Sequence, residues 1–527
     1  MRSQPINNPE DIINTTSIIH NYDVSVIMPF YKKLDEFKQA LLVNAPFLQR
    51  NGIEVIIVMD EDSQQEGLVA LLKEYPFTNW KVVVNHQPHE WRNPTKAINV
   101  GIQHATKKYV MVCSPESEFY TDAIYLLRTA LDNYPKHFAI GTVAFSFYRE
   151  ENEVNFHYYI PYGSIMVKKE YFVAIGGYDE SFCRWGGDDD NIRTRLEQYG
   201  IKKLILPEVK LIHREDKAKK EKSRGEKRME IPVQEEFEIY YPNHYKANLG
   251  EWGVDFNDVV YDWQCNACAK ELAEKYTQGF EKQHIPDVHV FSKRYRHIIL
   301  AQSYNESALI LGFLANMSLY FDGIILLDDG STDNTYEIAE HPKLLLKVQK
   351  KRAGFIDIKN RNILLDLASF FSSEWFCFMD TDERFDSRYV NFDLETADRN
   401  TDILSFSYVN IWNSDDAYNA EYPFSYQGIM PKMRMFRNIG HCQIMSDKKR
   451  VHFNLMPYQS NVRQCAVLFK HYGMASEQLR KEKYIFYRKE DIANDQKNYD
   501  HMLNHHPLLH YCVDIQFENG LFINKTV

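Results

Sequence analysis

The chain has 527 residues, which is too long for a single hydrophobic core and predicts two or more domains. Hydrophobic residues make up 44% of the sequence and aromatic residues 14%, so a packed core can form throughout and disorder is disfavoured. The formal net charge of -11 excludes a general attraction to phosphate backbones, and we expect no nucleic-acid partner.

No apolar run reaches the roughly 18 residues that a membrane span needs. The N-terminus also lacks the charged-then-apolar order of a signal peptide, so we expect a cytoplasmic protein. The cysteines suggest no disulfide framework. Cys265 and Cys268 have no second such pair with which to hold zinc, and we interpret them as reduced thiols on a helix.

Short apolar segments alternate with segments of helical periodicity through the first half. Strands are expected at 24–28, 54–59, 81–84 and 109–113, and helix-like segments follow the first three. Repeated strand and helix units predict an α/β fold of the Rossmann-like type, in which a mostly parallel sheet is covered by helices on both faces.

The same order of elements starts again near residue 297. A strand, a helix over 307–319, a strand at 323–327 and a later strand at 375–379 repeat the first half, which indicates a duplicated architecture. We expect two domains joined by a helical or irregular, aromatic-rich connector. The expected bounds are 1–230 for the first domain, 231–292 for the connector, and 293–527 for the second domain with a helical tail.

Acidic residues directly follow two expected strands of the second half. Asp328 and Asp329 come after 323–327, and Asp380 and Asp382 come after 375–379. Ligands of an open parallel sheet bind outside the carboxyl ends of its strands. Two carboxylates at i and i+2 can hold a hard divalent cation and, through it, a diphosphate. An isolated acidic pair is more often part of a surface turn, so these residues gain meaning only together with others.

The second half carries further motifs in a fixed order, namely QSYNE, DDGSTDNT, Arg361 with Asn362, and FMDTDERF. This set, over about 296–473, resembles the family 2 glycosyltransferases of the GT-A type, and PKMRMFRN and KHYG resemble their lipopolysaccharide-type members. The resemblance implies contacts to a nucleotide-sugar donor and a metal ligand in Asp382. The implied donor contacts are Ser303, Asp329, Arg361 and Asp380.

The general base of the second half stays open. Asp415, Asp416, His441 and His452 can each take a proton from an acceptor hydroxyl, and their spacing does not choose among them.

The best cluster of the first half is GGYDESFCRWGGDDDN at 176–191. Glycines let a backbone approach a sugar closely, and adjacent carboxylates beside a Trp suit sugar recognition and base catalysis. The same aspartates also suit the start of a helix. The segment resembles the signature of β-1,4-galactosyltransferases and of related chondroitin-polymerase-like family 2 domains, over about 24–216.

This resemblance implies that Asp189 is the catalytic base and that Asp188 binds the acceptor beside it. Trp185 and Gly187 would contact the acceptor as well, and His213 would bind a metal. Asp60 and Glu61 occupy the expected nucleotide-contacting turn.

The first half departs from the family pattern at two places. Ser114, Pro115 and Glu116 replace the expected Asp-x-Asp, so a metal would depend on Glu116 and His213, and a metal-independent or inactive first half is an alternative. Lys96 and Asn99 lie where the family has Arg and Asn, and a lysine lacks the bidentate fork of arginine.

We therefore predict a bifunctional inverting glycosyltransferase that uses nucleotide-sugar donors, expected to be UDP-sugars, and Mn²⁺ or Mg²⁺. Its acceptor would be a saccharide or lipid-linked saccharide, as in bacterial capsule or lipopolysaccharide synthesis. A lipid-linked acceptor would bring the protein to the inner face of the membrane without any span.

Three alternatives are kept beside this prediction. One half alone could be catalytic while the other binds saccharide or is inactive. A nucleotidyltransferase also uses carboxylates at strand ends, but VIMPFYKK and AQSYNE contain no glycine for a phosphate loop. A non-catalytic carbohydrate-binding scaffold would also explain the aromatic content.

Overall fold

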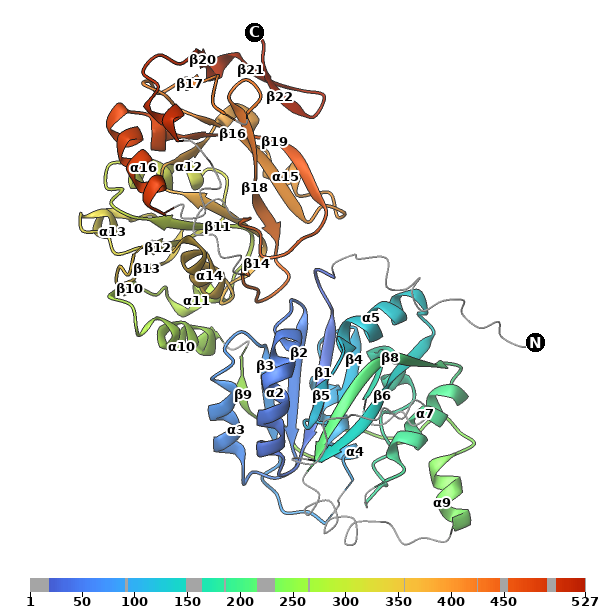
Figure 1. Ribbon diagram of the computed structural model, residues 1–527. Coiled ribbons are helices and arrows are strands. Elements are labelled where there is room, and N and C mark those ends of the chain that lie inside the picture. The colour runs from blue at the N-terminus through green and yellow to red at the C-terminus, as the bar shows by residue number, and fades with distance from the viewer. Residues whose placement is uncertain are drawn as a thin grey trace. The chain divides into compact units, whose positions relative to one another are not determined.

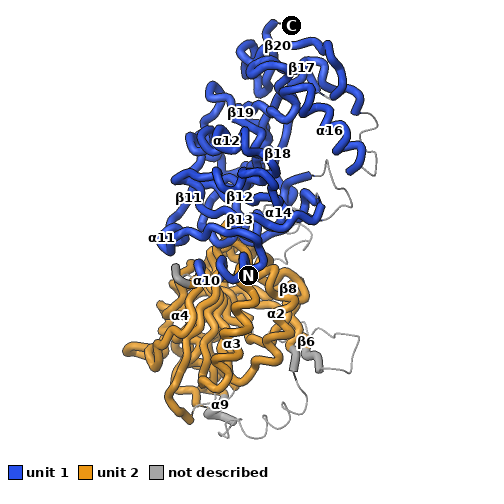
Figure 2. Tube along the Cα trace, turned by 90° about the vertical axis from the view of Figure 1, so that its left-hand side faces the viewer, with its two compact units in different colours: residues 1–18, 269–527 blue, residues 19–268 orange. Residues whose placement is uncertain are grey.

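The protein was analysed as a computed structural model, in which the chain forms two compact units at residues 19–268 and 269–527 (Figure 2). Each unit is built around one sheet with helices on its faces (Figure 1). The structure describes residues 19–90, 93–147, 164–183, 186–215, 233–263, 266–354, 356–423, 425–445, 454–490 and 499–526.

The first unit has a parallel centre of four strands in the order β3-β2-β1-β4. These strands are rich in apolar residues and are buried almost throughout, as expected for strands with helices on both faces. The bounds are β1 Val24–Phe30, α2 Leu34–Leu48, β2 Ile53–Met59, α3 Gln65–Leu72, β3 Trp80–Val84, α4 Thr95–His104 and β4 Tyr109–Cys113.

Beyond β4 the sheet continues with β7, β6, β8 and β5, and most of these neighbours pair antiparallel. The sheet is therefore mixed outside its parallel centre, which corrects the expectation of a mostly parallel sheet. The bounds are β5 Ser117–Phe119, α5 Ala123–Asn133, β6 His137–Phe147, β7 Ser164–Lys168, α6 Lys169–Ala174, α7 Asp188–Gln198, β8 Lys202–Glu215, α9 Val233–Tyr240 and β9 Asp258–Asp262.

The second unit repeats this plan with a parallel centre in the order β13-β12-β11-β14, followed by β18, β16, β19 and β15. Its bounds up to β15 are α10 Asn266–Thr277, β10 Lys282–His284, α11 Val288–Phe291, β11 Arg294–Ser303, α12 Ile310–Met317, β12 Gly323–Asp328, α13 Thr335–Ile338, β13 Leu344–Gln349, α14 Asp357–Ala368, β14 Ser372–Asp380 and β15 Glu383–Phe385.

The remaining elements of the second unit are α15 Phe392–Glu395, β16 Ile403–Asn410, β17 Ala417–Asn419, β18 Ile429–Arg437, β19 Val462–His471, α16 Glu477–Glu490, β20 Leu509–Tyr511, β21 Ile515–Glu518 and β22 Leu521–Asn524. Short 3₁₀ turns at 387–389, 472–474, 500–503 and 512–514 connect some of them. The expected helical tail is thus a helix, α16, followed by short strands that pair as β17 with β20 and β21 with β22.

The duplication extends to individual positions. The Asp60 amide donates to the Phe30 carbonyl at 3.0 Å, and the Asp329 amide donates to the Ser303 carbonyl at 2.8 Å. On the other flank, Ser117 of β5 pairs with His213 of β8, and Glu383 of β15 pairs with His471 of β19. Glu116 and His213 of the first unit therefore correspond to Asp382 and His471 of the second.

Residues 231–292, expected as a connector, are divided between the two units. β9 pairs antiparallel with β3 at the edge of the first sheet, and β10 pairs antiparallel with β13 at the edge of the second. Edge strands this short carry too little alternation to be recognised from a pattern, since a single strand face offers only two or three side chains.

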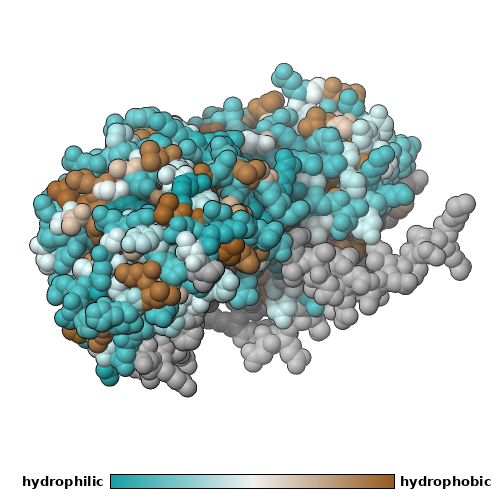
Figure 3. Space-filling model, turned by 90° about the horizontal axis from the view of Figure 1, so that it is seen from above, coloured by the Kyte–Doolittle hydropathy of each residue, from teal (hydrophilic) through white to brown (hydrophobic). Residues whose placement is uncertain are grey.

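The face seen in Figure 3 is mostly polar, with apolar residues in small separate patches. Among the described residues, no helix is both long and apolar enough to cross a bilayer.

Candidate active sites

Asp380 ends β14 at the carboxyl edge of the second sheet, where it meets two buried arginines. Its Oδ1 lies 2.6 Å from Nη2 of Arg361 on α14, and its Oδ2 lies 3.7 Å from Nη1 of Arg434 on β18. Both arginines are only 1% exposed. Gln302 at the end of β11 donates to the same Oδ1 at 3.3 Å and to Asp357 at 2.8 Å. The carboxylate is therefore held in one orientation from three elements.

Asp382 lies two residues further on and has a different set of partners. Its Oδ2 is 3.0 Å from Nζ of Lys483 on α16 and 3.2 Å from Nε2 of His471 at the end of β19. The other ring nitrogen of His471, Nδ1, lies 2.7 Å from Oδ1 of Asn410. An amide oxygen can only accept, so Nδ1 carries the proton, and the Nε2 lone pair accepts from the Lys483 ammonium at 3.2 Å.

These ion pairs control the ionisation of the cluster. Burial opposes the charged form of Asp380, but Arg361 and Arg434 outweigh it and lower the pKa to about 2. Burial likewise opposes ionisation of Asp382, yet the Lys483 ammonium lowers its pKa well below the usual range. Glu306 behaves in the opposite way, because burial and the neighbouring Asp382 raise its pKa to about 8.

Glu383 follows Asp382 directly, begins β15 and belongs to the same cluster. It forms an ion pair with Arg434 and accepts a hydrogen bond from the Asp380 amide at 2.9 Å. Burial raises its pKa to about 7 despite the arginine. Glu383 is 2% exposed, so we interpret it as a buried support for the Asp380 turn.

Asp329 follows β12 and is also held by cations. Its two carboxylate oxygens lie 2.6 Å from Lys350 and 2.8 Å from Arg352, and Arg352 stacks on the Tyr304 ring. Ser303 is buried, and its hydroxyl donates to Asp328 at 3.4 Å. The expected donor contacts Ser303 and Asp329 thus lie beside each other, and both are engaged within the protein.

The first unit has a carboxylate and histidine pair at the corresponding place. Oε1 of Glu116 lies 2.8 Å from Nε2 of His213 and 3.0 Å from Nζ of Lys33. Burial opposes ionisation of Glu116, but His213 and then Lys33 lower its pKa to about 2. The structure therefore brings together the two residues that the sequence predicts as metal ligands, and adds a lysine that the sequence analysis did not single out.

Asp188 and Asp189 form the first two positions of α7, as their alternative interpretation as helix-starting residues also expected. Asn93 donates to Asp188 at 3.3 Å, and Arg193 lies 3.6 Å from Asp189 one turn later. Burial and the neighbouring Asp189 raise the pKa of Asp188 to about 7, and burial raises that of Asp189 despite Arg193. The pKa of each of these two carboxyls is therefore higher than that of an ordinary aspartate.

Of three further expected contacts, Gly187 and Asn99 are packed within the first unit, and one lies outside the described residues. Gly187 has a φ of +84°, and an added Cβ would overlap the Tyr240 ring, so its glycine is required by packing. Asn99 is fully buried, and its amide group bonds to Tyr178 and Glu180, which leaves it no surface for a donor. Trp185 lies outside the described residues.

The other expected donor contacts of the first unit lie on its carboxyl edge. Asp60 is buried, and its carbonyl lies 2.7 Å from His89. Glu61 is bonded within its own turn, to the amide and hydroxyl of Ser63. Lys96 pairs with Asp255 at 3.1 Å. Lys96 is therefore tied to the segment after α9, which no local sequence pattern predicts.

The four candidates for the second general base lie at different places. His441 bonds to Asp366 at 2.8 Å and follows Arg437, which pairs with Trp375 at the amino end of β14. It therefore lies at the opposite edge of the sheet from Asp380. Asp416 pairs with Lys470 at 2.6 Å, and Asp415 beside it is exposed. His452 lies outside the described residues. The second unit also forms no helix like α7 in the described part of 438–461.

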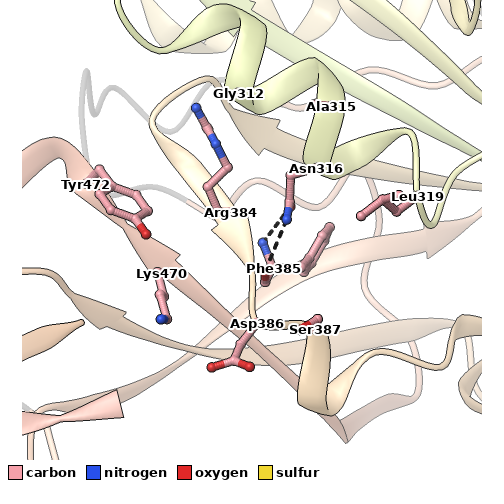
Figure 4. A pocket seen from close by; sticks show the side chains of 10 residues that line it. All are labelled: Gly312, Ala315, Asn316, Leu319, Arg384, Phe385, Asp386, Ser387, Lys470 and Tyr472. Atoms are coloured by element: carbon pink, nitrogen blue, oxygen red, sulfur yellow. Dashed lines mark hydrogen bonds between the residues drawn. The ribbon is translucent and has the colours of Figure 1, made fainter. Parts of the chain in front are cut away.

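An open cavity of about 590 Å³ lies between α12, β15 and β19 (Figure 4). Side chains alternate along paired strands, so Arg384 and Lys470 face this cavity while Glu383 and His471 face the charged cluster. Arg384 donates to the carbonyls of Thr381 and Glu383, and Lys470 is paired with Asp416. We interpret Arg384 as a support of the loop that carries Asp380 and Asp382.

His471, Lys483 and Glu306 are the residues that sequence reasoning missed in the second site. His471 lies in KHYG, which was noticed only as a distal motif. The duplication could have found it, because His213 ends the corresponding strand of the first half. Lys483 gives no local signal, since it lies on an otherwise polar, exposed helix.

Two of the expected metal ligands, Glu116 and His213, lie together, and the third, Asp382, lies beside His471, which the sequence analysis did not single out. Within the described ranges, no group of three or more His, Cys, Asp or Glu side chains is arranged to hold a metal ion. The donor types nevertheless fit a divalent cation. Carboxylate oxygen bonds at about 2.0–2.2 Å and histidine nitrogen at about 2.0–2.1 Å, so two ligands at right angles lie about 3 Å apart, close to the 3.2 Å between Asp382 and His471.

Both sheets thus carry a carboxylate beside a histidine at the carboxyl edge. Residues 25–182 and 299–450 match the family model described as glycosyl transferase family 2, and together they span more than half of the chain. The chain belongs to this family. Residues 145–221 also match a model described as the N-terminal domain of galactosyltransferase.

Among curated proteins, the chain is 26% identical to β-1,4-galactosyltransferase 1 of Mus musculus over 185 residues, which are 34% of this chain and 38% of the mouse protein. It is also 26% identical to β-1,4-galactosyltransferase 4 of Homo sapiens over 172 residues, which are 29% of this chain and 46% of that protein. The chain thus spans less than half the length of these relatives.

Among solved structures, GalNAc-T7 with UDP, GalNAc and Mn²⁺ is 15% identical with a TM-score of 0.30, over 37% of this chain and 43% of that chain. The mannosyltransferase PcManGT from Pyrobaculum calidifontis, in complex with GDP-Man and Mn²⁺, is 17% identical with a TM-score of 0.29, over 38% of this chain and 61% of that chain.

Proposed function

We propose that the chain is a bifunctional inverting glycosyltransferase with one transfer site in each unit. The observation that carries this proposal is the repetition of a carboxylate and histidine pair, Glu116 with His213 and Asp382 with His471, at the same register position of two duplicated sheets. A divalent cation, Mn²⁺ or Mg²⁺, held by each pair would neutralise the charge that develops on a departing nucleoside diphosphate.

In the first unit, we propose that Asp189 is the base and that Asp188 orients the acceptor hydroxyl. Asp189 takes the hydroxyl proton as the acceptor oxygen attacks the anomeric carbon. The bond from that carbon to the diphosphate breaks, and the nucleoside diphosphate leaves with the electron pair. The raised pKa of both carboxyls supports this role, because a base works best when its pKa lies near the operating pH.

The donor of the first unit is proposed to be a UDP-sugar. The similarity to β-1,4-galactosyltransferases makes UDP-galactose the first donor to test. Asp60 would contact the nucleotide, and Glu116 with His213 would hold the cation.

In the second unit, Arg361 and Arg434 fix Asp380 toward the proposed donor site. Because both arginines are buried, their charge is little screened and favours the binding of a diphosphate beside Asp380. Asp329 is proposed to contact the nucleotide, with Lys350 and Arg352 keeping its carboxylate in place. The base of this unit stays unassigned.

Two transfer sites on one chain suit the successive addition of two sugars to a growing saccharide, such as a bacterial capsule or lipopolysaccharide. The alternative that one observation favours is a chain with a single active unit, since Ser114 replaces one carboxylate of the first site.

Measuring which nucleotide-sugar donors are consumed distinguishes a chain with two active units from a chain with one. The full chain is incubated with Mn²⁺, a panel of acceptor sugars, and UDP-, GDP- and CMP-sugars, and the released nucleotide is measured for the wild type, Asp189→Asn and Asp382→Asn. Two sites predict two consumed donors, one lost in each variant. Loss of all consumption in Asp382→Asn alone, with Asp189→Asn unchanged, would leave the first unit as a binding domain.

A further inference from the structure

In the second unit, a lysine ammonium lies between the two side chains proposed to hold the cation. Nζ of Lys483 is 3.0 Å from Oδ2 of Asp382 and 3.2 Å from Nε2 of His471, and these two ligand atoms are themselves 3.2 Å apart. Because Asn410 keeps the proton of His471 on Nδ1, the Nε2 lone pair is free to accept from the ammonium. Lys483 thus makes the contacts that a bound cation would make.

Gly473 makes this arrangement possible. An added Cβ at Gly473 would overlap both the Lys483 amine and the Asp382 carboxylate. Gly473 does not have a positive φ, so its small size rather than its backbone conformation is what the site requires. The glycine of KHYG therefore leaves the space in which the lysine side chain reaches the pair.

The first unit also has a lysine on the carboxylate of its pair, supplied by a different part of the chain. Nζ of Lys33 lies 3.0 Å from Glu116, which is bonded to His213 at 2.8 Å. Lys33 comes three residues after β1, whereas Lys483 comes from α16. The position that corresponds to Lys33 in the second unit is Glu306, so the recurrence of a lysine is not inherited from the duplicated sequence.

We propose that Lys483 and Lys33 are built-in competitors of the divalent cation, each of which occupies the cation position until an ion displaces its ammonium. The proposal rests on the proposed cation sites. An ammonium and a divalent ion cannot share a carboxylate and an imidazole lone pair at this distance, because two like charges about 3 Å apart repel strongly even near a protein surface. Metal binding therefore requires the lysine side chain to leave.

The test is the affinity of the purified full chain for Mn²⁺ without any sugar or nucleotide, measured by titration calorimetry. Lys483→Met removes the charge and keeps an unbranched apolar side chain of similar length. We expect it to tighten Mn²⁺ binding at the second site at least about tenfold, because a unit charge a few ångströms away opposes the ion. Lys33→Met is expected to do the same at the first site.

Lys481→Met is the matched control, because Lys481 lies on the same helix and pairs with the exposed Glu477. It should leave the Mn²⁺ affinity unchanged. Adding Asp382→Asn to Lys483→Met should abolish the gain, which assigns it to this pair. Circular dichroism shows whether each variant is folded, and Lys33→Met changes only a partly exposed loop side chain should Lys483→Met fail to fold.

Folded Lys483→Met and Lys33→Met variants that bind Mn²⁺ no more tightly than the wild type would overturn the proposal. So would an equal gain in Lys481→Met. Since no sugar is present, either result is independent of whether the chain transfers sugar.

Discussion

Two neighbouring aspartates at the start of α7 carry the chemistry proposed for the first unit. Ordinary aspartates are fully ionised at neutral pH, but burial and the adjacent Asp189 raise the pKa of Asp188 to about 7. Helix starts normally favour ionised aspartates, since the helix dipole stabilises them there. The loss of water contact therefore outweighs the dipole at this site.

This raised pKa predicts a dependence of stability on pH. The unfolded chain loses the Asp188 proton near pH 4, whereas the folded chain keeps it to about pH 7, so folding stability falls as the pH rises between these values. Asp188→Asn should remove this fall and make the first unit more stable than the wild type at pH 8. The gain is about 1.4 kcal/mol for each pKa unit between the two states.

Urea unfolding at pH 5 and pH 8 measures this effect. A wild-type chain whose stability is the same at both values, or an Asp188→Asn variant that is less stable at pH 8, would contradict the raised pKa of Asp188.

In the second unit, we expect Arg434 to be important for stability, because it pairs with Glu383 and lies near Asp380. Arg434→Met should cost about 3–5 kcal/mol of unfolding free energy, because it leaves the buried Glu383 without its partner. The double variant with Glu383→Gln should recover part of this loss. Equal stability of the single and double variants in urea would mean that the two side chains are not coupled.

At the scale of elements, α7 and α16 distinguish the two units. In the first, α7 brings two carboxylates to the carboxyl edge, and α9 packs against it through Tyr240 and the Asn191 bond to the Ile239 carbonyl. In the second, α16 follows β19 and brings Lys483 to the corresponding pair. The shared sheet thus supplies the cation pair, while different helices complete each site.

The start of α7 depends on Gly187, whose positive φ and contact with Tyr240 exclude a side chain. Gly187→Ala should abolish transfer by the first unit and leave transfer by the second intact, because only α7 is displaced. Gly200→Ala is the control, since Gly200 also has a positive φ but an added Cβ meets no atom within 4 Å. It should cost about 1 kcal/mol of stability and keep both activities. If the Gly187→Ala variant kept transfer by both units, the claim that transfer by the first unit depends on α7 would be wrong.

At the scale of the whole molecule, each unit holds a complete sheet and its own hydrophobic core. Residues 1–263 and 264–527 should therefore each fold when produced separately, since the division falls between β9 and α10. Far-ultraviolet circular dichroism with a cooperative thermal transition would support this for each piece. An unfolded piece would show that the units depend on each other.

Much of this organisation was predictable from the sequence. Buried parallel strands are rich in apolar residues, so the four central strands of the first sheet, three of the four in the second, and the carboxylates that follow them could be located. The fourth central strand of the second sheet, β13, was not predicted. The repeated order also predicted the duplication. The resemblance to family 2 glycosyltransferases, carried by FMDTDERF and GGYDESFCRWGGDDDN, then identified the family.

What the sequence did not predict depends on contacts between distant residues. Lys483 reaches Asp382 across 101 positions of sequence, and Lys96 reaches Asp255 across 159. Asn99 matched a family position but is buried by Gly253 and Tyr178, which come from other segments. The edge strands β9 and β10 are too short to produce a pattern of their own.

The central claim is that two independent transfer sites lie on one chain, and the most direct measurement is the mass of the acceptor product. Asp189→Asn and Asp382→Asn are each incubated with acceptor and both donors, alone and as a mixture. The account predicts that the mixture makes the two-sugar product of the wild type, while each variant alone stops at or before one sugar. A mixture that never extends beyond the product of the better single variant would contradict two independent sites.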